Sequence, residues 1–214
     1  MVLDGQRENV DPLLTRMAKG FTGINPNTLT WISLLFAFLA GLFFYFSNPV
    51  NELFNFYLYF ASLFIFLNGF FDAVDGKVAK LTKKTSLKGD FLDHAIDRFA
   101  DALILGGLAL SPWCIRNPAI GLFAVVGMLL TSYMGTQSQA VGNKRNYRGL
   151  LGRADRMVVL MIAPIAQHVL LIFDIHLIYG FYLLEWVLIV FAILGIFTAI
   201  QRFYTTLRWF DNKK

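Results

Sequence analysis

The stretch DAVDGKVAKLTKKTSLKGDFLDHAIDRFAD, residues 72–101, separates two apolar parts of the chain and contains six of its 14 acidic residues. These six are Asp72, Asp75, Asp90, Asp93, Asp97 and Asp101. The first two are three residues apart and the other four follow at steps of three, four and four, so each group lies on one helix face. Carboxylates at membrane depth are costly and usually functional. We therefore expect two antiparallel helices that point these carboxylates into one shared space.

The apolar parts of the chain predict an integral membrane protein. Hydrophobic residues make up 57% of the 214 residues and charged residues only 15%, whereas soluble domains are roughly 25% charged. Five uncharged runs approach the roughly 20 residues that cross a bilayer. They are residues 29–46, 53–71, 119–142, 157–173 and 186–200. Residues 102–113 make a sixth span if their helix begins near Gly89 and carries several aspartates.

The basic residues predict how these six spans are oriented. Of the 19 Lys and Arg residues, 17 fall before the first span, in the second and fourth connections or in the tail. Arg116 alone falls on the opposite side, and Arg98 lies within the third span. By the positive-inside rule, both termini and the aspartates face the cytoplasm at the cell membrane. This topology accounts for the net charge of +5, so we expect no nucleic-acid partner.

The predicted fold class is therefore all-α and integral to the membrane, with six transmembrane helices. Residues 1–24 form a cytoplasmic juxtamembrane segment, in which residues 9–21 are expected to form an amphipathic surface helix. Residues 25–209 form the six-helix transmembrane domain that carries the expected catalytic site, and residues 210–214 form a cytoplasmic tail.

The aspartates predict a site for a hard divalent cation. Carboxylates held close together repel one another, and a bound cation removes this repulsion. Oxygen ligands suit Mg²⁺ or Mn²⁺, and zinc is disfavoured because the chain offers one cysteine, Cys114, and no suitable histidine cluster. Gly76 and Gly89 let a ligand approach the backbone closely. Five lysines line the same connection and can meet phosphate, which points to a lipid-linked diphosphate.

These residues resemble the signature of the CDP-alcohol phosphotransferase family, D-x2-D-G-x2-A-R-x8-G-x3-D-x3-D. Every fixed position matches except one, because Lys80 stands where the signature has arginine. The matching residues are Asp72, Asp75, Gly76, Ala79, Gly89, Asp93 and Asp97. A Pro-Asn-x-x-Thr element (Pro26, Asn27, Thr30) before the first span and Ser132-Tyr133 late in the fourth add to the similarity.

The resemblance implies a membrane enzyme of phospholipid synthesis. Such an enzyme transfers a phosphatidyl-type group from a CDP-linked lipid, CDP-diacylglycerol or CDP-archaeol, to a small polar alcohol and releases CMP. The resemblance implies two ions, Mg²⁺ or Mn²⁺, held by Asp72, Asp75, Asp93 and Asp97, with Asp97 also the general base. The positions matching nucleotide-binding residues are Asn27, Thr30, Asp75, Gly76, Ala79, Lys80, Ser86 and Gly89. Family members are often dimers, so we also expect a homodimer.

Two further runs bear on the acceptor alcohol. In the branch of the family that uses inositol phosphate, helix four ends with a run rich in cations and a second arginine-rich run opens helix five. Here the first run, residues 132–139, has no cation, and the second keeps Arg153 and Arg156. The resemblance favours inositol phosphate or another polyol phosphate as acceptor, with Ser132, Gln137, Arg153 and Arg156 as candidate ligands.

Other interpretations stay open from the sequence. The same signature serves transfer of a headgroup from a soluble CDP-alcohol to a lipid alcohol. An ion-coupled transporter could also use intramembrane aspartates, although the cluster lies at one face and no inverted repeat is visible. Arg153 and Arg156 could be ordinary positive-inside anchors. Asp90 and Asp101 lie outside the signature and could be supporting or merely polar.

Overall fold

The computed structural model describes residues 7–50, 55–143, 149 and 152–212, and side chains from residue 11 onwards within these ranges. Helices account for its regular structure, apart from an isolated bridge between Ile178 and Phe181. A short helix, α1 (Arg7–Ala18), and a 3-10 turn, η2 (Lys19–Phe21), precede the long helices. The long helices are α2 (Pro26–Phe46), α4 (Tyr57–Leu81), α5 (Leu87–Ala109), α6 (Pro118–Ala140), α7 (Arg153–Ile172) and α8 (Leu183–Asp211). The predicted all-α class is confirmed.

Five of the long helices, α2, α4, α6, α7 and α8, are long and apolar enough to cross a membrane. α5 is the helix predicted to be unusual, because it carries four of the aspartates along its 23 residues. Several expectations lie outside the described residues. They concern residues 1–6, residues 51–54 at the predicted start of the second span, and the basic residues Lys144, Arg145, Arg148, Lys213 and Lys214.

Two helices extend well beyond their predicted apolar runs. α4 continues ten residues past position 71, so Lys77 and Lys80 lie on its last turns and not in the connection where the sequence placed them. α8 likewise continues to Asp211. Backbone hydrogen bonds form in polar segments as readily as in apolar ones, so a helix need not end where the hydrophobic run ends.

Local capping explains where the helices of the site begin. Asn25 caps α2, because its side-chain Oδ1 accepts a hydrogen bond of 3.0 Å from the backbone N–H of Asn27, and Pro26 occupies the first turn. Ser86 caps α5 in the same way, accepting 3.0 Å from the backbone N–H of Gly89. These caps fix the starts of α2 and α5 beside the end of α4.

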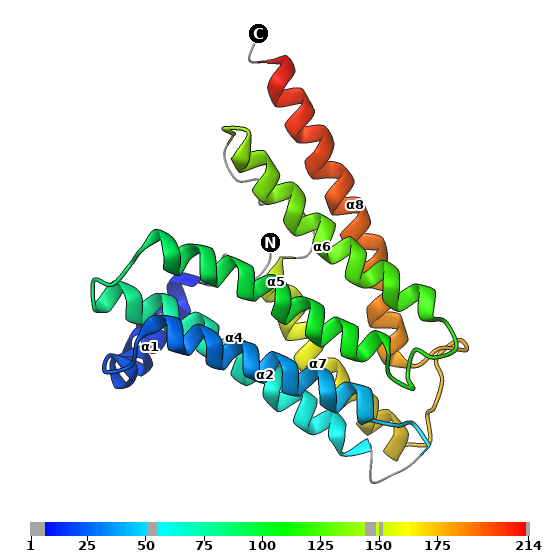
Figure 1. Cartoon of the computed structure of the whole chain (residues 1–214). Coiled ribbons are helices and arrows are strands. Elements are labelled where there is room, and N and C mark those ends of the chain that lie inside the picture. Colours follow the sequence, from blue (N-terminus) through cyan, green and yellow to red (C-terminus); the bar gives the residue numbers. More distant parts are fainter. Residues whose placement is uncertain (1–6, 51–54, 144–148, 150–151, 213–214) are drawn as a thin grey trace.

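α2 packs along both α4 and α5, α7 packs against α4 and α8, and α6 pairs along α8 (Figure 1). The α2–α5 crossing is close because Gly107 lies directly on the backbone of Gly41, where any side chain would collide. Small residues allow this close approach between membrane helices. The C-terminal halves of α6 and α8 rise together away from the other helices (Figure 1). The Gly107–Gly41 contact therefore sets how closely α5 approaches α2.

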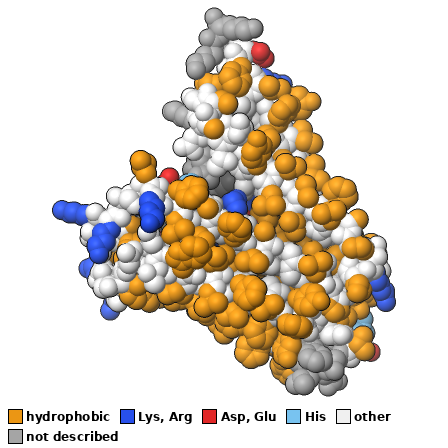
Figure 2. Space-filling view, in the orientation of Figure 1, with side chains coloured by type: hydrophobic (Ala, Val, Ile, Leu, Met, Phe, Trp, Pro, Cys, Tyr) orange, Lys and Arg blue, Asp and Glu red, His pale blue; other side chains and the backbone are white. Residues whose placement is uncertain are grey.

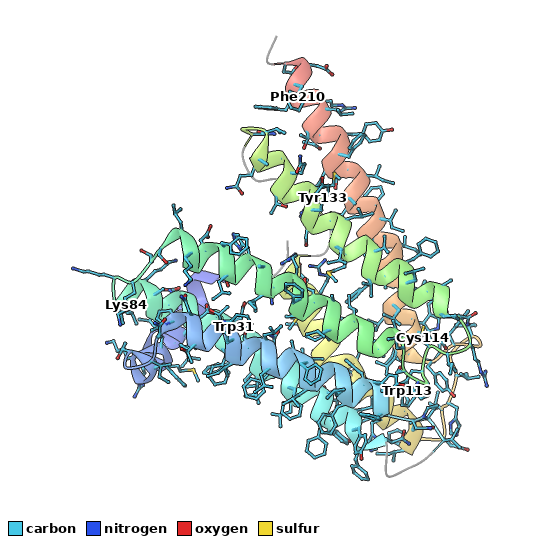
Figure 3. All side chains as sticks on the ribbon, viewed as in Figure 1. Trp31, Lys84, Trp113, Cys114, Tyr133 and Phe210 are labelled. Carbon is cyan, nitrogen blue, oxygen red and sulfur yellow. The ribbon has the colours of Figure 1, made fainter. Side chains whose placement is uncertain are left out.

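The outer surface is largely apolar. Large apolar side chains such as Trp31 and Leu35 are more than half exposed, and Figure 2 shows hydrophobic side chains over most of the visible face. Blue Lys and Arg side chains gather at the end of the α4–α5 hairpin. Lys84 marks this end in Figure 3, whereas Trp113 and Cys114 lie at the opposite end of the bundle. An apolar side surface, with charged side chains gathered at one end of the bundle, is expected of a protein embedded in a membrane.

α1 and η2 pack on the polar end of α4. Phe21 meets Phe70 and Phe71 edge to face, with ring centroids 6.1 and 5.8 Å apart. Lys77 on α4 forms an ion pair with Asp11 on α1. The segment predicted as a surface helix is thus helical and is held against the end of the bundle that carries the aspartates.

Candidate metal and substrate site

Three aspartates of the signature converge where the end of α4 meets the first turns of α5. Asp72, Asp93 and Asp97 each offer a carboxylate oxygen, and these three oxygens lie within 4.8 Å of one another. All three side chains are partly buried. Carboxylate oxygens at this spacing suit a hard cation such as Mg²⁺ or Mn²⁺, with small side-chain adjustments. The donor set therefore fits the divalent metal that the sequence predicts.

Asp75, the fourth signature aspartate, stands apart from this group of three. Its side chain is buried, and its Oδ2 accepts a hydrogen bond of 2.6 Å from Thr30 Oγ1 on α2. The family resemblance implies that Asp75 binds both metal and nucleotide and that Thr30 binds the nucleotide. In the structure the Thr30 hydroxyl donates a hydrogen bond to the Asp75 carboxylate. Thr30 therefore contributes to the site by holding the side chain of Asp75.

Arg153, at the first turn of α7, lies beside two of the converging carboxylates. Its Nη1 is 2.7 Å from Asp72 Oδ2 and 2.8 Å from Asp97 Oδ1. A second arginine, Arg98, places its Nη2 3.2 Å from Asp97 Oδ2. Arg153 thus links α7 to both helices of the aspartate site, a contact that a simple positive-inside anchor would not make.

Asp101 lies one helical turn beyond Asp97 and is buried. Its carboxylate is 3.4 Å from Arg153 Nε, 3.6 Å from Arg98 Nη1 and 3.6 Å from Arg156 Nη2. Asp101 and Arg156 also line a small cavity between α5, α6 and α7. Three arginines, among them both acceptor candidates of α7, therefore meet one carboxylate outside the signature.

The predicted nucleotide-binding residues fall into two groups. Ser86 and Gly89 are joined by the α5 cap, and a Cβ atom added at Gly89 would lie 3.5 Å from Asn27 Oδ1. This places Asn27 of α2 against the first turn of α5. Gly76 faces open space, and Lys80 is exposed one turn later on α4. Ala79 is partly buried between them.

The acceptor candidates on α6 differ from one another. The Ser132 hydroxyl accepts a hydrogen bond from Arg98, so Ser132 belongs to the arginine network. Gln137 is exposed farther along α6. The structure therefore joins Ser132 to Arg153 and Arg156 through Arg98 and Asp101, and it leaves Gln137 outside this set.

The contacts of two residues of the site come from the structure. The sequence predicts a supporting or merely polar role for Asp101 and places Arg98 within the third span. The spacing of Asp101, four residues after Asp97, was the available signal because it continues the stripe of aspartates. Nothing in the sequence pairs Arg98 with Ser132, 34 positions away.

Comparison with known proteins shows what this chain is similar to. A family model described as CDP-alcohol phosphatidyltransferase matches residues 24–201. The chain is 32% identical to an archaetidylinositol phosphate synthase of Pyrococcus horikoshii, over 92% of this chain and 93% of the relative. It is 31% identical to a phosphatidylinositol phosphate synthase of Streptomyces avermitilis, over 66% of this chain and 56% of the relative.

The fold also matches solved structures. The phosphatidylinositol phosphate synthase of Mycobacterium tuberculosis with CDP-DAG bound superposes with a TM-score of 0.71 at 20% identity, covering 91% of this chain and 94% of that one. Its complex with manganese and citrate superposes with a TM-score of 0.70, covering 91% of this chain and 88% of that one. The arrangement of helices is thus shared with these proteins.

Proposed function

The chain belongs to the CDP-alcohol phosphatidyltransferase family, and from this premise we propose that it transfers a phosphatidyl-type group from a CDP-linked lipid to inositol phosphate, releasing CMP. The observation that carries the proposal is the convergence of Asp72, Asp93 and Asp97 beneath Arg153 at one end of the bundle. The names of the relatives from Pyrococcus horikoshii and Streptomyces avermitilis support inositol phosphate as the acceptor.

We assign two divalent ions to the four signature aspartates. Asp72, Asp93 and Asp97 are placed to share an ion, and Asp75 lies three residues from Asp72 on α4, within reach of a second. When bound, such ions clamp the diphosphate and stabilise the negative charge that builds on the departing CMP. Thr30 holds Asp75 in one orientation from α2.

Asp97 takes the role of general base in this proposal. The acceptor hydroxyl oxygen forms a bond to the phosphorus that carries the lipid, while the bond from that phosphorus to the oxygen of CMP breaks. The hydroxyl proton passes to an Asp97 oxygen, and the electron pair of the broken bond leaves with CMP. A carboxylate within hydrogen-bond reach of the hydroxyl supplies this step. The contact of Asp97 with Arg98 orients its side chain.

The CDP group is assigned to the side of the site formed by the starts of α2 and α5 and the end of α4. Asn27, Ser86 and Gly89 lie together there, and Gly76 leaves its side of α4 open to a ligand. Lys80 is exposed on the same end of α4 and can meet a phosphate as a point charge. The two caps make the backbone at this place well defined, which suits nucleotide recognition.

The acceptor phosphate is assigned to Arg153 and Arg156 at the start of α7, with Ser132 beside them and Gln137 at the outer edge. Guanidinium groups bind phosphate in a bidentate manner. The first turn of a helix adds partly positive backbone N–H groups that favour an anion. Arg153 also touches Asp97, so a phosphate on Arg153 would bring its alcohol close to the proposed base.

We place six spans in the membrane, with both termini and the site at the cytoplasmic face. α5 is long enough for the sixth span, and its charged half lies at the end where the basic residues gather. We also assign α1 to the membrane surface, and expect residues 25–209 to form one catalytic domain and the protein to be a homodimer. Labelling a cysteine introduced at Asn212 in a Cys114→Ser background, in sealed vesicles, tests the sidedness. Cross-linking in native membranes tests the dimer.

An acceptor screen tests the function. Purified protein with Mg²⁺ or Mn²⁺ is given CDP-diacylglycerol or CDP-archaeol and, in turn, inositol phosphate, glycerol phosphate, inositol or serine. We expect CMP release with inositol phosphate and a lipid product that carries the inositol phosphate group. A parallel reaction receives a soluble CDP-alcohol and a lipid alcohol, and CMP release only in that reaction would reverse the assigned direction. No CMP release under any of these conditions would refute the proposal.

A further inference from the structure

Asp101 is the one buried carboxylate of the network that the family signature does not include. It is 6% exposed and lies on α5 at the same face as Asp97. Its Oδ2 has no hydrogen-bond partner of good geometry, although two guanidinium groups lie 3.6 Å away. A buried carboxylate in this setting is costly unless surrounding cations stabilise it. The family signature does not explain why a carboxylate is buried at this position.

The contacts of Arg153 divide between two kinds of carboxylate. On one side its Nη1 lies against Asp72 and Asp97, whose oxygens are the ones offered to a cation. On the other side its Nε faces Asp101. A guanidinium and a divalent cation compete for the same oxygens, so the grip of Arg153 on Asp72 and Asp97 opposes metal binding. Asp101 offers the same guanidinium a carboxylate that does not belong to the group of three converging aspartates.

We propose that Asp101 is a positioning residue, which holds Arg153 and Arg156 for the acceptor and remains as a partner for Arg153 when a cation takes the oxygens of Asp72 and Asp97. The acceptor half of this inference rests on the proposed function. The metal half rests on the proposed metal site together with the ion pairs of Arg153. Without Asp101, Arg156 loses the carboxylate it faces. Arg153 then keeps only Asp72 and Asp97 among the carboxylates described beside it, so a cation must displace it from its remaining partners.

A double-mutant cycle on metal binding tests the action of Asp101 through Arg153. Mn²⁺ binding to the full-length protein in detergent is followed by the electron paramagnetic resonance signal of free Mn²⁺, without nucleotide or acceptor. We expect Asp101→Asn to weaken Mn²⁺ binding about tenfold and Arg153→Gln to tighten it several-fold. In the Arg153→Gln background, Asp101→Asn should change Mn²⁺ affinity less than twofold. Asp90→Asn removes the same charge from an exposed site of α5 and is the matched control.

The cycle separates a positioning role from a general charge effect. If Asp101 only adds negative charge near the metal, its substitution weakens Mn²⁺ binding equally with and without Arg153. That result, or an unchanged Mn²⁺ affinity in Arg153→Gln, would overturn the proposal. Should Asp101→Asn not fold, Asp101→Glu takes its place in the cycle, with a smaller shift of the same sign expected.

The acceptor half has its own measurement. With inositol phosphate as the probe and Mn²⁺ saturating for each variant, Asp101→Asn should raise the KM of the acceptor about tenfold and that of CDP-diacylglycerol less than twofold, and Asp101→Glu should recover part of the loss. An unchanged acceptor KM would refute this half. If the wild-type protein does not use inositol phosphate, the proposed function fails, while the Mn²⁺ cycle still decides whether Asp101 positions Arg153.

Discussion

Thr30 Oγ1 donates a hydrogen bond of 2.6 Å to Asp75 Oδ2, and this contact joins α2 to α4 beside the three converging aspartates. Both side chains are buried, and they are 45 positions apart in the chain. A buried polar group is costly unless it is hydrogen-bonded, so each partner stabilises the other. The Pro-Asn-x-x-Thr element, which the family resemblance assigns to the nucleotide, therefore also contacts the aspartate site through Thr30.

Replacing Thr30 with valine should lower turnover, because it removes the donor to Asp75 while keeping the shape of the side chain. We expect CMP release to fall about tenfold and the free energy of unfolding to fall by about 1–3 kcal/mol. Thr30→Ser should retain most of both. Thr28→Val, on the exposed side of the same helix, is the control. Wild-type kinetics in Thr30→Val would show that Asp75 needs no partner.

Replacing Asp97 with asparagine should nearly abolish transfer while the protein still folds. Asparagine keeps the size of the side chain but cannot accept the proton, a loss on the order of 10²- to 10⁴-fold. Initial rates of CMP release measure the loss, and size-exclusion chromatography reports the fold. Asp90→Asn, an exposed change on the same helix, should stay near the wild-type rate. A nearly unaffected Asp97→Asn enzyme would mean that another group takes the proton.

Removing divalent cations should stop the reaction. Treatment with EDTA should end CMP release, and Mg²⁺ or Mn²⁺ should restore it. Asp93→Asn removes one of the three converging carboxylates, so the cation concentration for half-maximal rate should rise on the order of tenfold or more. Asp211→Asn at the exposed end of α8 should leave that concentration unchanged. Undiminished CMP release after exhaustive chelation would contradict the metal assignment.

Lys80 occupies the position where the family signature has arginine, so its charge and its geometry can be tested apart. Lys80→Gln removes the charge and should raise the KM of the CDP-linked lipid about tenfold. Lys80→Arg keeps the charge and should stay within about threefold of the wild-type KM. Lys83→Gln, an exposed neighbour outside the signature, is the control. A donor KM that is equal in Lys80→Gln and the wild type would remove Lys80 from the site.

Two adjacent glycines on α5 should respond differently to alanine. A Cβ atom at Gly107 would strike the backbone of Gly41, whereas a Cβ atom at Gly106 meets no atom within 4 Å. Gly107→Ala should therefore lower the thermal midpoint, at a cost of about 1–3 kcal/mol. Gly106→Ala should leave it unchanged or raise it slightly, since alanine favours helix over glycine by about 1 kcal/mol. Equal midpoints in the two variants would argue against the close α2–α5 crossing.

The sequence alone was sufficient for the family and the fold class. Spacings of three and four residues put Asp72 with Asp75, and Asp93 with Asp97 and Asp101, on single helix faces, because the helix repeat is local. The apolar runs predicted the helices, although α4 continued ten residues past its run. The family resemblance and the assignment as a CDP-alcohol phosphotransferase are confirmed by the match over residues 24–201.

Only the tertiary structure decided which residues meet between helices. It brings Asp72 together with Asp93 and Asp97, pairs Asp75 with Thr30, and places Arg153 between Asp72 and Asp101. These distances depend on how closely the helices cross. For α2 and α5, the contact of Gly107 with Gly41 sets the separation. A residue pattern within one helix fixes a direction around its axis, but the separation between helices follows from packing over the whole bundle.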